Sequence, residues 1–442
     1  MKITEAIPFV YNKVNSFYEG LALVRIDDKW GFIDNTGTMV ISCKKYNFSH
    51  LALAYTCFGK GFSDGLAAIQ VAGGNKYGEY GFIDKLGNEV ISPVYDAVRD
   101  FSCGAAIVGI VDGSLGQDAD GTPRCKWGAI NKNGDEIIPI GKYKRLGGNP
   151  EYCRDNPGVG DTIHDGNARK FYEGMAFVYP WGNDNESSKY GFADTLGNEI
   201  LPPIYAYDES SRIYRERFYN GLSNVSFGYG KQQAAIDKTG KIVFQHNYYH
   251  MDYFYDEITR AYNIKPYEIF FIDKKGNQPF TLPLKYSGAD AFHEGMALVC
   301  IGSGNTFKFK RGFIDINGQE IVPCKYDNAK SYYDGIAVVG MGDYRYGKKG
   351  AVDKQGREFI PCKYDQVDQL GHGLVEVCIQ RREKRGYAEH MLVESKCGIY
   401  DTLGQEIVPP IYDAIRRFCE GMAAVRKGEK WGFIKIDDIG SA

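Results

Sequence analysis

The sequence has little net charge, no long apolar run and few cysteine pairs, and each shortage excludes a class of protein. Its 442 residues carry 53 basic and 56 acidic side chains, so the basic excess of a general nucleic-acid binder is missing. No apolar stretch reaches the roughly 18 residues that a transmembrane helix needs, so we expect no membrane span. Residues 1–8 lack the apolar core of a signal peptide, which favours the cytoplasm unless a specialised secretion route serves the protein.

Cysteines are present but poorly arranged for crosslinks or metals. The count is 11, an odd number, and no C-x-x-C pair occurs, which favours a reducing compartment over a disulfide framework. Cys43, Cys324 and Cys362 recur in one slot shortly before a tyrosine, as small core residues do. The P-loop, H-E-x-x-H and G-x-S-x-G signatures are also missing. We therefore assign no catalytic residue and expect no cofactor.

Glycine and aromatic residues are abundant instead, and they mark an internal repeat. The chain has 54 Gly, 33 Tyr and 25 Phe. The sequence KWGFID at 29–34 returns with variations, as YGFID at 80–84 and KWGFI at 430–434. Ten units follow when the glycine slot is placed at 31, 81, 128, 191, 234, 270, 312, 350, 398 and 432. We predict one tandem array over 1–442, with a seam within 228–280 that would divide it into 1–227 and 281–442.

Each unit carries the pattern of three or four short antiparallel strands. An acid–glycine pair such as Glu19–Gly20 precedes an alternating strand, the Trp-Gly strand follows, and an Asp-x-x-Gly turn leads to a third strand. The acid–glycine pair predicts a second turn or bulge with positive φ, and Asp-x-x-Gly predicts a tight hairpin. The glycine after Trp or Tyr is expected to let an aromatic ring lie across bare backbone. The recurring acids, present in most units, are interpreted as structural.

Such units are too small to fold alone, so neighbours must stack and share a core. We predict an all-β tandem repeat that is β-propeller-like, with an open β-superhelix or solenoid as the alternative. The segment Thr4–Asn12 matches the second half of a unit, whereas the chain ends on a first half, Trp431–Ile434. Pairing between these two terminal strands would close the array and remove exposed edges.

The repeated K-W-G-F-I-D and G-x-E-I-I-P-P-x-Y-D elements resemble the WG-repeat family, which is found mostly in bacterial proteins. The match runs from Ile7 to Ile434, although Tyr80 and Tyr190 replace the tryptophan in some units. The Trp-Gly pairs are Trp30 and Gly31, Trp127 and Gly128, and Trp431 and Gly432. The family is generally treated as an interaction repeat without a common enzymatic activity. The resemblance therefore implies the architecture and favours binding over catalysis.

Function should reside in what differs between units, because the repeated residues hold the fold. Candidates for partner contact are Trp181 in a polar loop, Tyr248, Tyr249, Tyr253 and Tyr255 in an aromatic stretch, and Arg381, Arg382 and Arg385 in a basic hairpin tip. Local packing, a seam core and a solvated loop are the respective alternatives. Asp118 and Asp120 are weak candidates for a calcium loop that lacks its terminal Glu, so no metal is expected.

The leading hypothesis is a non-catalytic scaffold that binds a protein partner through variable loops on one face of the array. A lectin-like carbohydrate binder is the alternative, because Trp181 and the surplus tyrosines suit stacking on sugars. An enzyme with a site in a central channel is a third hypothesis, which rests on analogy between folds alone.

Overall fold

The computed structural model describes residues 2–42, 61–71, 79–116, 124–147, 170–181, 189–206, 217–227, 232–303, 308–343, 345–385 and 389–437. The chain divides into two compact units. Unit 1 comprises Met1–Asp27, Asn35–Thr38 and Tyr249–Ala442, and unit 2 comprises Asp28–Asp34 and Met39–Tyr248. The single array with its seam stays a prediction. No helix within the described ranges is long and apolar enough to cross a membrane.

Unit 1 consists of small antiparallel sheets. One has the order β1 (Lys2–Tyr11), β37 (Lys430–Asp437), β36 (Met422–Lys427) and β35 (Ala414–Ile415). A second holds β23 (Gly288–His293), β24 (Met296–Ser303), β25 (Lys308–Asp315) and β26 (Glu320–Tyr326). A third holds β27 (Asn328–Ala329), β28 (Ile336–Met341), β29 (Lys348–Asp353) and β30 (Glu358–Tyr364). A fourth holds β31 (Gln366–Gly371), β32 (Leu374–Arg385), β33 (Glu389–Asp401) and β34 (Glu406–Tyr412). Another holds β20 (His250–Met251), β21 (Ile258–Ile264) and β22 (Tyr267–Asp273), and β2 (Lys13–Val14) pairs with β3 (Ala22–Ile26).

Unit 2 repeats the same meander. Its strands β4 (Lys29–Ile33) and β5 (Met39–Ser42) pair, and β6 (Phe62–Ser63), β7 (Leu66–Gln70), β8 (Tyr80–Ile83) and β9 (Glu89–Tyr95) form one sheet. A seven-stranded sheet holds β10 (Ala97–Val98), β11 (Ala105–Val111), β12 (Cys125–Asn131), β13 (Glu136–Leu146), β14 (Met175–Pro180), β15 (Lys189–Asp194) and β16 (Glu199–Ala206), with the short helix η1 (Gly113–Leu115) before β12. The last sheet holds β17 (Leu222–Phe227), β18 (Gln232–Asp237) and β19 (Ile242–His246). The predicted all-β, propeller-like repeat class is confirmed, since most of these sheets are short antiparallel meanders of three or four strands.

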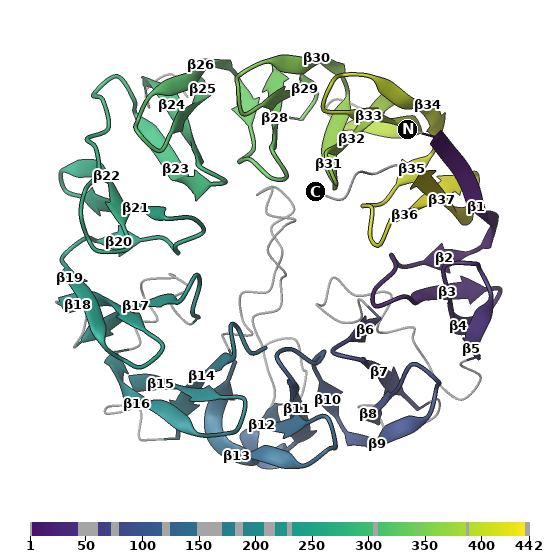
Figure 1. Ribbon diagram of the computed structural model, residues 1–442, viewed down its shortest axis with the longest axis vertical. Helices are drawn as coiled ribbons and strands as arrows, with labels where there is room; N and C mark the ends of the chain where they lie inside the picture. The colour runs from purple at the N-terminus through teal and green to yellow at the C-terminus, as the bar shows by residue number, and fades with distance from the viewer. Residues whose placement is uncertain are drawn as a thin grey trace. The chain divides into compact units, whose positions relative to one another are not determined.

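The two terminal strands pair within unit 1, as the complementary halves of the terminal repeats predict. Figure 1 shows β1, in purple, beside β37, in yellow. Ile7 lies opposite Phe433 and Tyr11 lies opposite Trp431. The N-terminal strand therefore supplies the outer strand of a sheet whose other strands come from the C-terminal end. The choice between a closed ring and a superhelix stays a prediction.

The hydrophobic core lies between neighbouring sheets, as expected of repeats that cannot fold alone. In unit 1, Leu298, Phe313 and Val322 of the β23–β26 sheet pack against Val339 and Val352 of the β27–β30 sheet. The inner strands of these sheets, such as β28, are buried on both faces, so their sequences are nearly continuous apolar runs. The polar residues of such strands therefore need a separate explanation.

The acid–glycine pairs form two-residue turns in which both residues have positive φ. Asp334 has φ 51° and Gly335 has φ 75°, and the main chains of Tyr333 and Ile336 pair across them. This is the hairpin turn that matches strand twist. The side chain of the preceding turn's acid caps it, because Glu294 accepts from the N–H groups of Asp334 at 2.5 Å and of Gly335 at 2.8 Å. The same bond joins Glu173 to Gly221 in unit 2 and Glu420 to Gly20 in unit 1, so the predicted structural role of these acids is confirmed.

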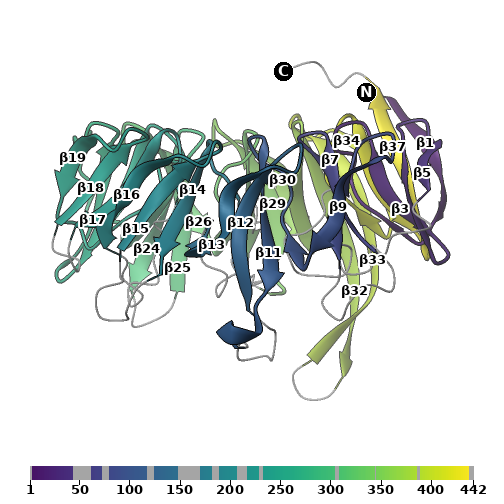
Figure 2. The same cartoon turned by 90° about the horizontal axis from the view of Figure 1, so that it is seen from below.

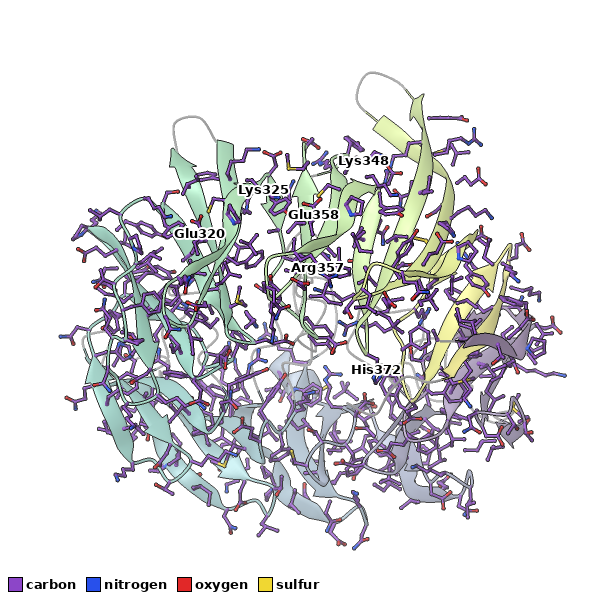
Figure 3. The ribbon with its side chains drawn as sticks, turned by 45° about the horizontal axis from the view of Figure 1, so that its top comes forward. Glu320, Lys325, Lys348, Arg357, Glu358 and His372 are labelled. Atoms are coloured by element: carbon purple, nitrogen blue, oxygen red, sulfur yellow. A yellow bond between two sulfur atoms is a disulfide. The ribbon has the colours of Figure 1, made fainter. Side chains whose placement is uncertain are left out.

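The Asp-x-x-Gly turns and the strand-ending tyrosines are also structural. Asp315 Oδ1 accepts from the N–H groups of Asn317 and Gln319 at 2.9 and 2.8 Å, and Gly318 has φ 79°. Tyr326 Oη donates to Glu358 Oε2 at 2.7 Å on the next sheet, beside Lys325 (Figure 3). The tyrosine–glutamate bond connects neighbouring sheets.

The glycine after the aromatic residue serves a different purpose from the one that the sequence suggested. A Cβ atom on Gly81 or Gly191, which follow Tyr80 and Tyr190, would lie 2.3 or 2.2 Å from the carbonyl oxygen of Ile91 or Leu201 on the third strand. One on Gly312, at the equivalent position of another repeat, would lie 2.3 Å from the carbonyl oxygen of Val322. The pairing register shifts at this point, so the third strand passes closely over the glycine. The expectation of an aromatic ring over bare backbone is therefore wrong, because backbone of the neighbouring strand fills that space.

Replacing Gly312 by Ala should destabilise the protein by about 2 kcal/mol or more, because a backbone carbonyl cannot move as a side chain can. The matched control is Gly335→Ala, where positive φ adds strain but nothing lies within 4 Å of the new Cβ. Urea unfolding of both variants compares the two costs. Equal midpoint shifts would contradict the close backbone approach at Gly312.

One cysteine pair was not expected from the sequence. Cys378 and Cys397 form a disulfide across β32 and β33, where they lie directly opposite each other with Cα atoms 4.1 Å apart. Spacing alone could not show this pair, because 19 residues of unknown hairpin register separate the two positions. Cys324 and Cys362 are half-buried as expected, and burial raises the pKa of each thiol to about 11. Cys43 lies outside the described residues.

Candidate functional site

The positions that depart from the repeat pattern are found by comparing equivalent strands. The third residue of the strand after the acid–glycine turn, which we call the third-residue slot, is apolar in Leu298, Val338 and Ala424. In unit 1 the same slot holds Arg260 in β21 and Glu376 in β32. These positions are equivalent, because in every case the slot residue is the third residue of the strand to pair with the Trp-Gly strand. Two charged groups thus enter a position that the fold fills with apolar side chains.

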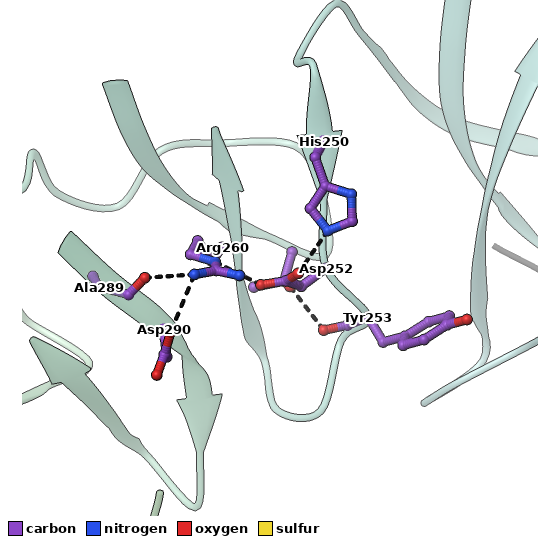
Figure 4. Close-up of polar contacts among 7 residues, drawn as sticks. His250, Asp252, Tyr253, Arg260, Ala289 and Asp290 are labelled. Carbon is purple, nitrogen blue, oxygen red and sulfur yellow. Dashed lines mark hydrogen bonds and ion pairs between the residues drawn. The ribbon is translucent and has the colours of Figure 1, made fainter. Parts of the chain in front are cut away.

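Arg260 is the centre of a charged network in the β20–β22 sheet. We call His250, Asp252, Arg260 and Asp290 the Asp252 cluster (Figure 4). Arg260 Nε donates to Asp252 Oδ2 at 2.7 Å, and its Nη1 donates to the Ala289 carbonyl at 2.7 Å and pairs with Asp290 at 3.2 Å. His250 Nε2 lies 2.7 Å from Asp252 Oδ1. Both oxygens of Asp252 are therefore occupied, which explains how a charged slot is tolerated in the core.

The electrostatics of the Asp252 cluster follow from burial and pairing. Burial alone would raise the pKa of Asp252, but His250 and Arg260 outweigh it and hold the pKa below its usual value. Burial raises the pKa of Asp290, and the nearby Arg260 only partly opposes this. The cluster is thus a preformed set of charges in which Asp252 is ionised and Asp290 is the weaker acid.

The cluster adjoins an exposed aromatic surface, which we call the tyrosine face and define as Tyr249, Tyr262 and Tyr267. The Tyr262 ring lies 5.1 Å from His250 and 6.1 Å from Tyr249, measured between centroids. Tyr249 is 50% exposed and Tyr267 is 59% exposed. Amphipathic rings beside fixed polar groups suit binding to a partner or ligand. Among the described residues, His250 Nδ1 is buried and has no hydrogen-bond partner.

The aromatic stretch is only partly brought together. Tyr249 belongs to the tyrosine face, whereas Tyr253 and Tyr255 contact each other and Tyr255 stacks on His293 at 4.6 Å. Tyr248 lies in unit 2, where its ring stacks on His246 at 5.4 Å. Tyr262 and Tyr267 lie in the same aromatic stretch of the sequence, whereas Asp252, Arg260 and Asp290 were missed by sequence reasoning. Comparing the third-residue slot across units would have found Arg260, because the repeat pattern predicts an apolar residue there.

The basic hairpin tip belongs to a long extension of β32 and β33. These strands have 12 and 13 residues, whereas the equivalent β28 and β29 have 6 each. Arg381 pairs with Glu383 at 3.0 Å and with Glu394 at 3.6 Å. The Arg382 guanidinium lies over the Tyr346 ring at 5.7 Å, and the backbone of Arg385 pairs with Glu389. The three arginines therefore lie on paired strands that lead to the tip.

The other predicted residues lie apart from these features. Trp181 is 44% exposed in unit 2, and its Nε1 donates to the Gly141 carbonyl at 2.7 Å, so its orientation is fixed by a local bond. Trp30 is buried, and Trp127 and Trp431 are half-buried beneath Arg99 and Arg416 respectively. Gly31, Gly128 and Gly432 lie close to the backbone of an adjacent strand. Asp118 and Asp120 lie outside the described residues.

Comparisons with solved structures give low identity throughout. The chain is similar to a structure described as the eukaryotic initiation factor, with 10% identity, a TM-score of 0.44, and coverage of 85% of this chain and 92% of that one. The Dos1 propeller gives 11% identity, a TM-score of 0.32, and coverage of 75% and 90%. The β-propeller domain of the Trilobed protease from Pyrococcus furiosus gives 10% identity, a TM-score of 0.27, and coverage of 70% and 94%.

The search of curated proteins finds no match. A family profile, in contrast, matches most of the chain. The profile is described as WG containing repeat, and it matches residues 4–30, 30–50, 80–110, 127–150, 190–228, 269–304, 312–344, 350–380 and 398–431. On the strength of these nine matches, the chain belongs to the family of WG containing repeat proteins.

Proposed function

We propose that the protein is a non-catalytic scaffold of the cytoplasm that binds a partner protein through the extension of β32 and β33. We call this extension the arm and define it as residues 379–385 and 389–396. Figure 2 shows the arm projecting past the neighbouring β29–β30 strands of the same unit. Its main chain pairs from Ile379 opposite Lys396 to Arg385 opposite Glu389, with one register shift between Arg381 and Arg382. A rigid hairpin of this kind presents side chains without a large ordering cost on binding.

The single observation that carries the proposal is the exposed apolar surface of the arm. Ile379 is 54% exposed, and Met391, Leu392 and Val393 are exposed on the opposing strand. Beyond the sheet no second layer covers these strands within the described residues. Met391 and Leu392 are consecutive residues of a strand, so they offer apolar contacts on opposite faces of the hairpin. Each such side chain yields about 1.5–3 kcal/mol when it is fully buried. Apolar residues beside arginine are also the composition of protein interfaces.

The charges of the arm favour a protein partner with carboxylates at its rim. Arg381 is 60% exposed and its partner Glu394 is 51% exposed, so their ion pair is screened by water and contributes little. Arg381 can therefore leave Glu394 and pair with a carboxylate of the partner at little cost in free energy. Arg382 adds a second guanidinium, two positions from Lys384 along the strand. The arginines would then set orientation while the apolar residues supply affinity.

The experiment identifies the partner first and then measures its affinity. A photo-crosslinking residue at Leu392 should capture a partner that the same residue at Leu403 does not, because Leu403 is 73% exposed but lies in a repeat turn. With the purified partner, the double variant Met391→Ser and Leu392→Ser should weaken binding at least tenfold. The fold should persist, since neither side chain belongs to a buried core cluster.

The matched control for the arm is Leu403→Ser, which also replaces an exposed leucine by serine. It should leave the affinity unchanged. Equal crosslinking from Leu392 and Leu403, or an affinity that survives the double arm variant, would overturn the proposal. Either result would show that the arm is not the contact surface.

Carbohydrate binding is the second candidate function, and the tyrosine face favours it. Tyr249 and Tyr267 expose their rings beside the hydrogen-bonding groups of the Asp252 cluster, an arrangement that suits stacking on a sugar ring. A glycan that binds the chain, loses affinity with Tyr267→Ala and keeps it with the arm variant would support this function over the scaffold.

A further inference from the structure

The base of the arm holds three residues with ligand chemistry. Glu376, Cys378 and Cys397 place one carboxylate oxygen and two sulfur atoms within 4.8 Å of one another. Glu376 and Cys378 are two residues apart on β32, so their side chains leave the same face of the strand. Cys397 is directly opposite Cys378 on β33. All three are buried, with Glu376 only 6% exposed.

A buried glutamate at this point needs a compensating charge, whereas the contact that the described residues give it is a hydrogen bond from the Ile415 main chain. Glu376 occupies the third-residue slot, where Leu298 and Val338 are apolar. No lysine or arginine of the described residues forms an ion pair with Glu376, in contrast to Arg260, which has Asp252. The opposite residue on β31 is Asp368, which adds charge of the same sign. An isolated buried carboxylate is costly, so this slot is suited to a cation.

We propose that Glu376, Cys378 and Cys397, once the disulfide is reduced, bind one thiophilic divalent cation such as Zn²⁺. Two thiolates and a carboxylate are ligands that Zn²⁺ accepts, with a water molecule as the fourth. This inference concerns the base of the arm and does not rest on partner binding by its exposed residues.

The chemistry requires a reductant, for which we name a small dithiol. It gives two electrons and two protons to the Cys378–Cys397 bond, the S–S bond breaks, and the dithiol closes to its own disulfide. The cation then displaces the two thiol protons and, where the carboxyl is protonated, the proton of Glu376. No other oxidant or reductant is needed.

The strands hold the ligands in place after reduction. Val377 pairs with Gly398 on one side of the cysteines, and Ile379 pairs with Lys396 on the other. The two sulfurs therefore stay on adjacent, registered positions without the covalent bond. Ser395 Oγ lies 3.6 Å from Cys397 Sγ, where a hydroxyl can stabilise a thiolate. A preformed set of ligands of this kind loses little entropy when the metal binds.

The experiment uses the full chain, reduced with dithiothreitol, desalted without oxygen and titrated with Co²⁺. We expect one equivalent of Co²⁺ to bind with thiolate-to-metal charge-transfer absorption, which Zn²⁺ then removes by displacement. The oxidised chain should give no such absorption. Circular dichroism checks that the reduced chain keeps its β-sheet spectrum.

Variants assign the ligands. Cys378→Ser and Cys397→Ser should each abolish the absorption, and Glu376→Gln should weaken Co²⁺ binding at least tenfold while both thiols stay present. The matched control is Cys362→Ser, a half-buried cysteine on β30 that should bind as the native chain does. The proposal is overturned if the reduced chain gives no absorption, if binding survives Cys378→Ser, or if reduction abolishes the β-sheet spectrum.

Discussion

Removal of residues 1–11 should destabilise unit 1 by about 5 kcal/mol or more. The lost strand buries Ile7 completely and Tyr11 almost completely, and full burial of such side chains contributes about 1.5–3 kcal/mol each. Phe9 would also leave its stacking contact with Tyr412, whose ring centroid is 6.2 Å away. The unpaired edge of β37 would then be open to another chain, so we expect self-association as well as a lower urea midpoint.

A peptide with the sequence of residues 2–11 provides the sharpest check of this pairing. Added to the truncated chain, it should raise the urea midpoint and suppress association, because it restores the partner of β37. The matched peptide with Ile7→Lys should do neither, since Ile7 is buried opposite Phe433. A truncated chain that unfolds at the native midpoint would refute the stabilising role of the terminal pairing.

The repeat explains why so much of the fold could be predicted from the sequence. Turn glycines and acids recur because each unit solves the same local problem, and the structure shows the predicted turns at Asp315 and Asp334. The terminal pairing was predictable for a related reason, because the two half units complement each other. Local chemistry repeated many times gives a strong signal even where one copy is eroded.

Contacts between units were not predictable in the same way. The Gly335 N–H donates to Glu294, and the Tyr326 hydroxyl donates to Glu358. Each of these bonds joins two different sheets, so no single sequence repeat contains both partners. The role of Gly312 was misjudged for that reason as well, because the atom that fills its space belongs to a strand ten residues later in the same sheet. Such contacts depend on where strands cross, which periodicity does not specify.

The candidate sites are the least predictable part of the molecule. The aromatic stretch around Tyr249 was visible as composition, but the Asp252 cluster beside it follows from one arginine in an apolar slot. The Cys378–Cys397 pair depends on the register of a hairpin whose length differs from that of the other units. In both places the useful signal is a departure from the repeat, and it becomes readable once equivalent strands are aligned.

Glu376 in the third-residue slot makes the stability of the protein fall as pH rises, which is the reverse of the usual effect of a carboxyl group. Burial, and to a smaller extent the charge of Asp368, raise the pKa of Glu376 to about 8, and a hydrogen bond from the Ile415 N–H only partly opposes them. In the unfolded chain the carboxyl titrates near 4.5. Below that value both states are protonated and the contribution is fully present. As pH rises from 4.5 to about 8, only the unfolded state releases its proton, so stability falls by about 1.4 kcal/mol for each pH unit.

Glu376→Gln should remove this loss, because an amide does not ionise. With the disulfide closed, the variant should gain several kcal/mol relative to the native chain between pH 5 and pH 8, roughly the sum expected from that slope. Urea unfolding at pH 5, 6.5 and 8 measures the difference.

The matched control is Glu320→Gln, because Lys285 and Tyr286 lower the pKa of Glu320 and its charged form stabilises the fold. Since this stabilisation is fully present above about pH 4.5, that control should be less stable than the native chain by an amount that stays constant from pH 5 to pH 8. Parallel curves for the native chain and Glu376→Gln would mean that Glu376 is ionised in the folded state, and that the slot already contains a compensating charge.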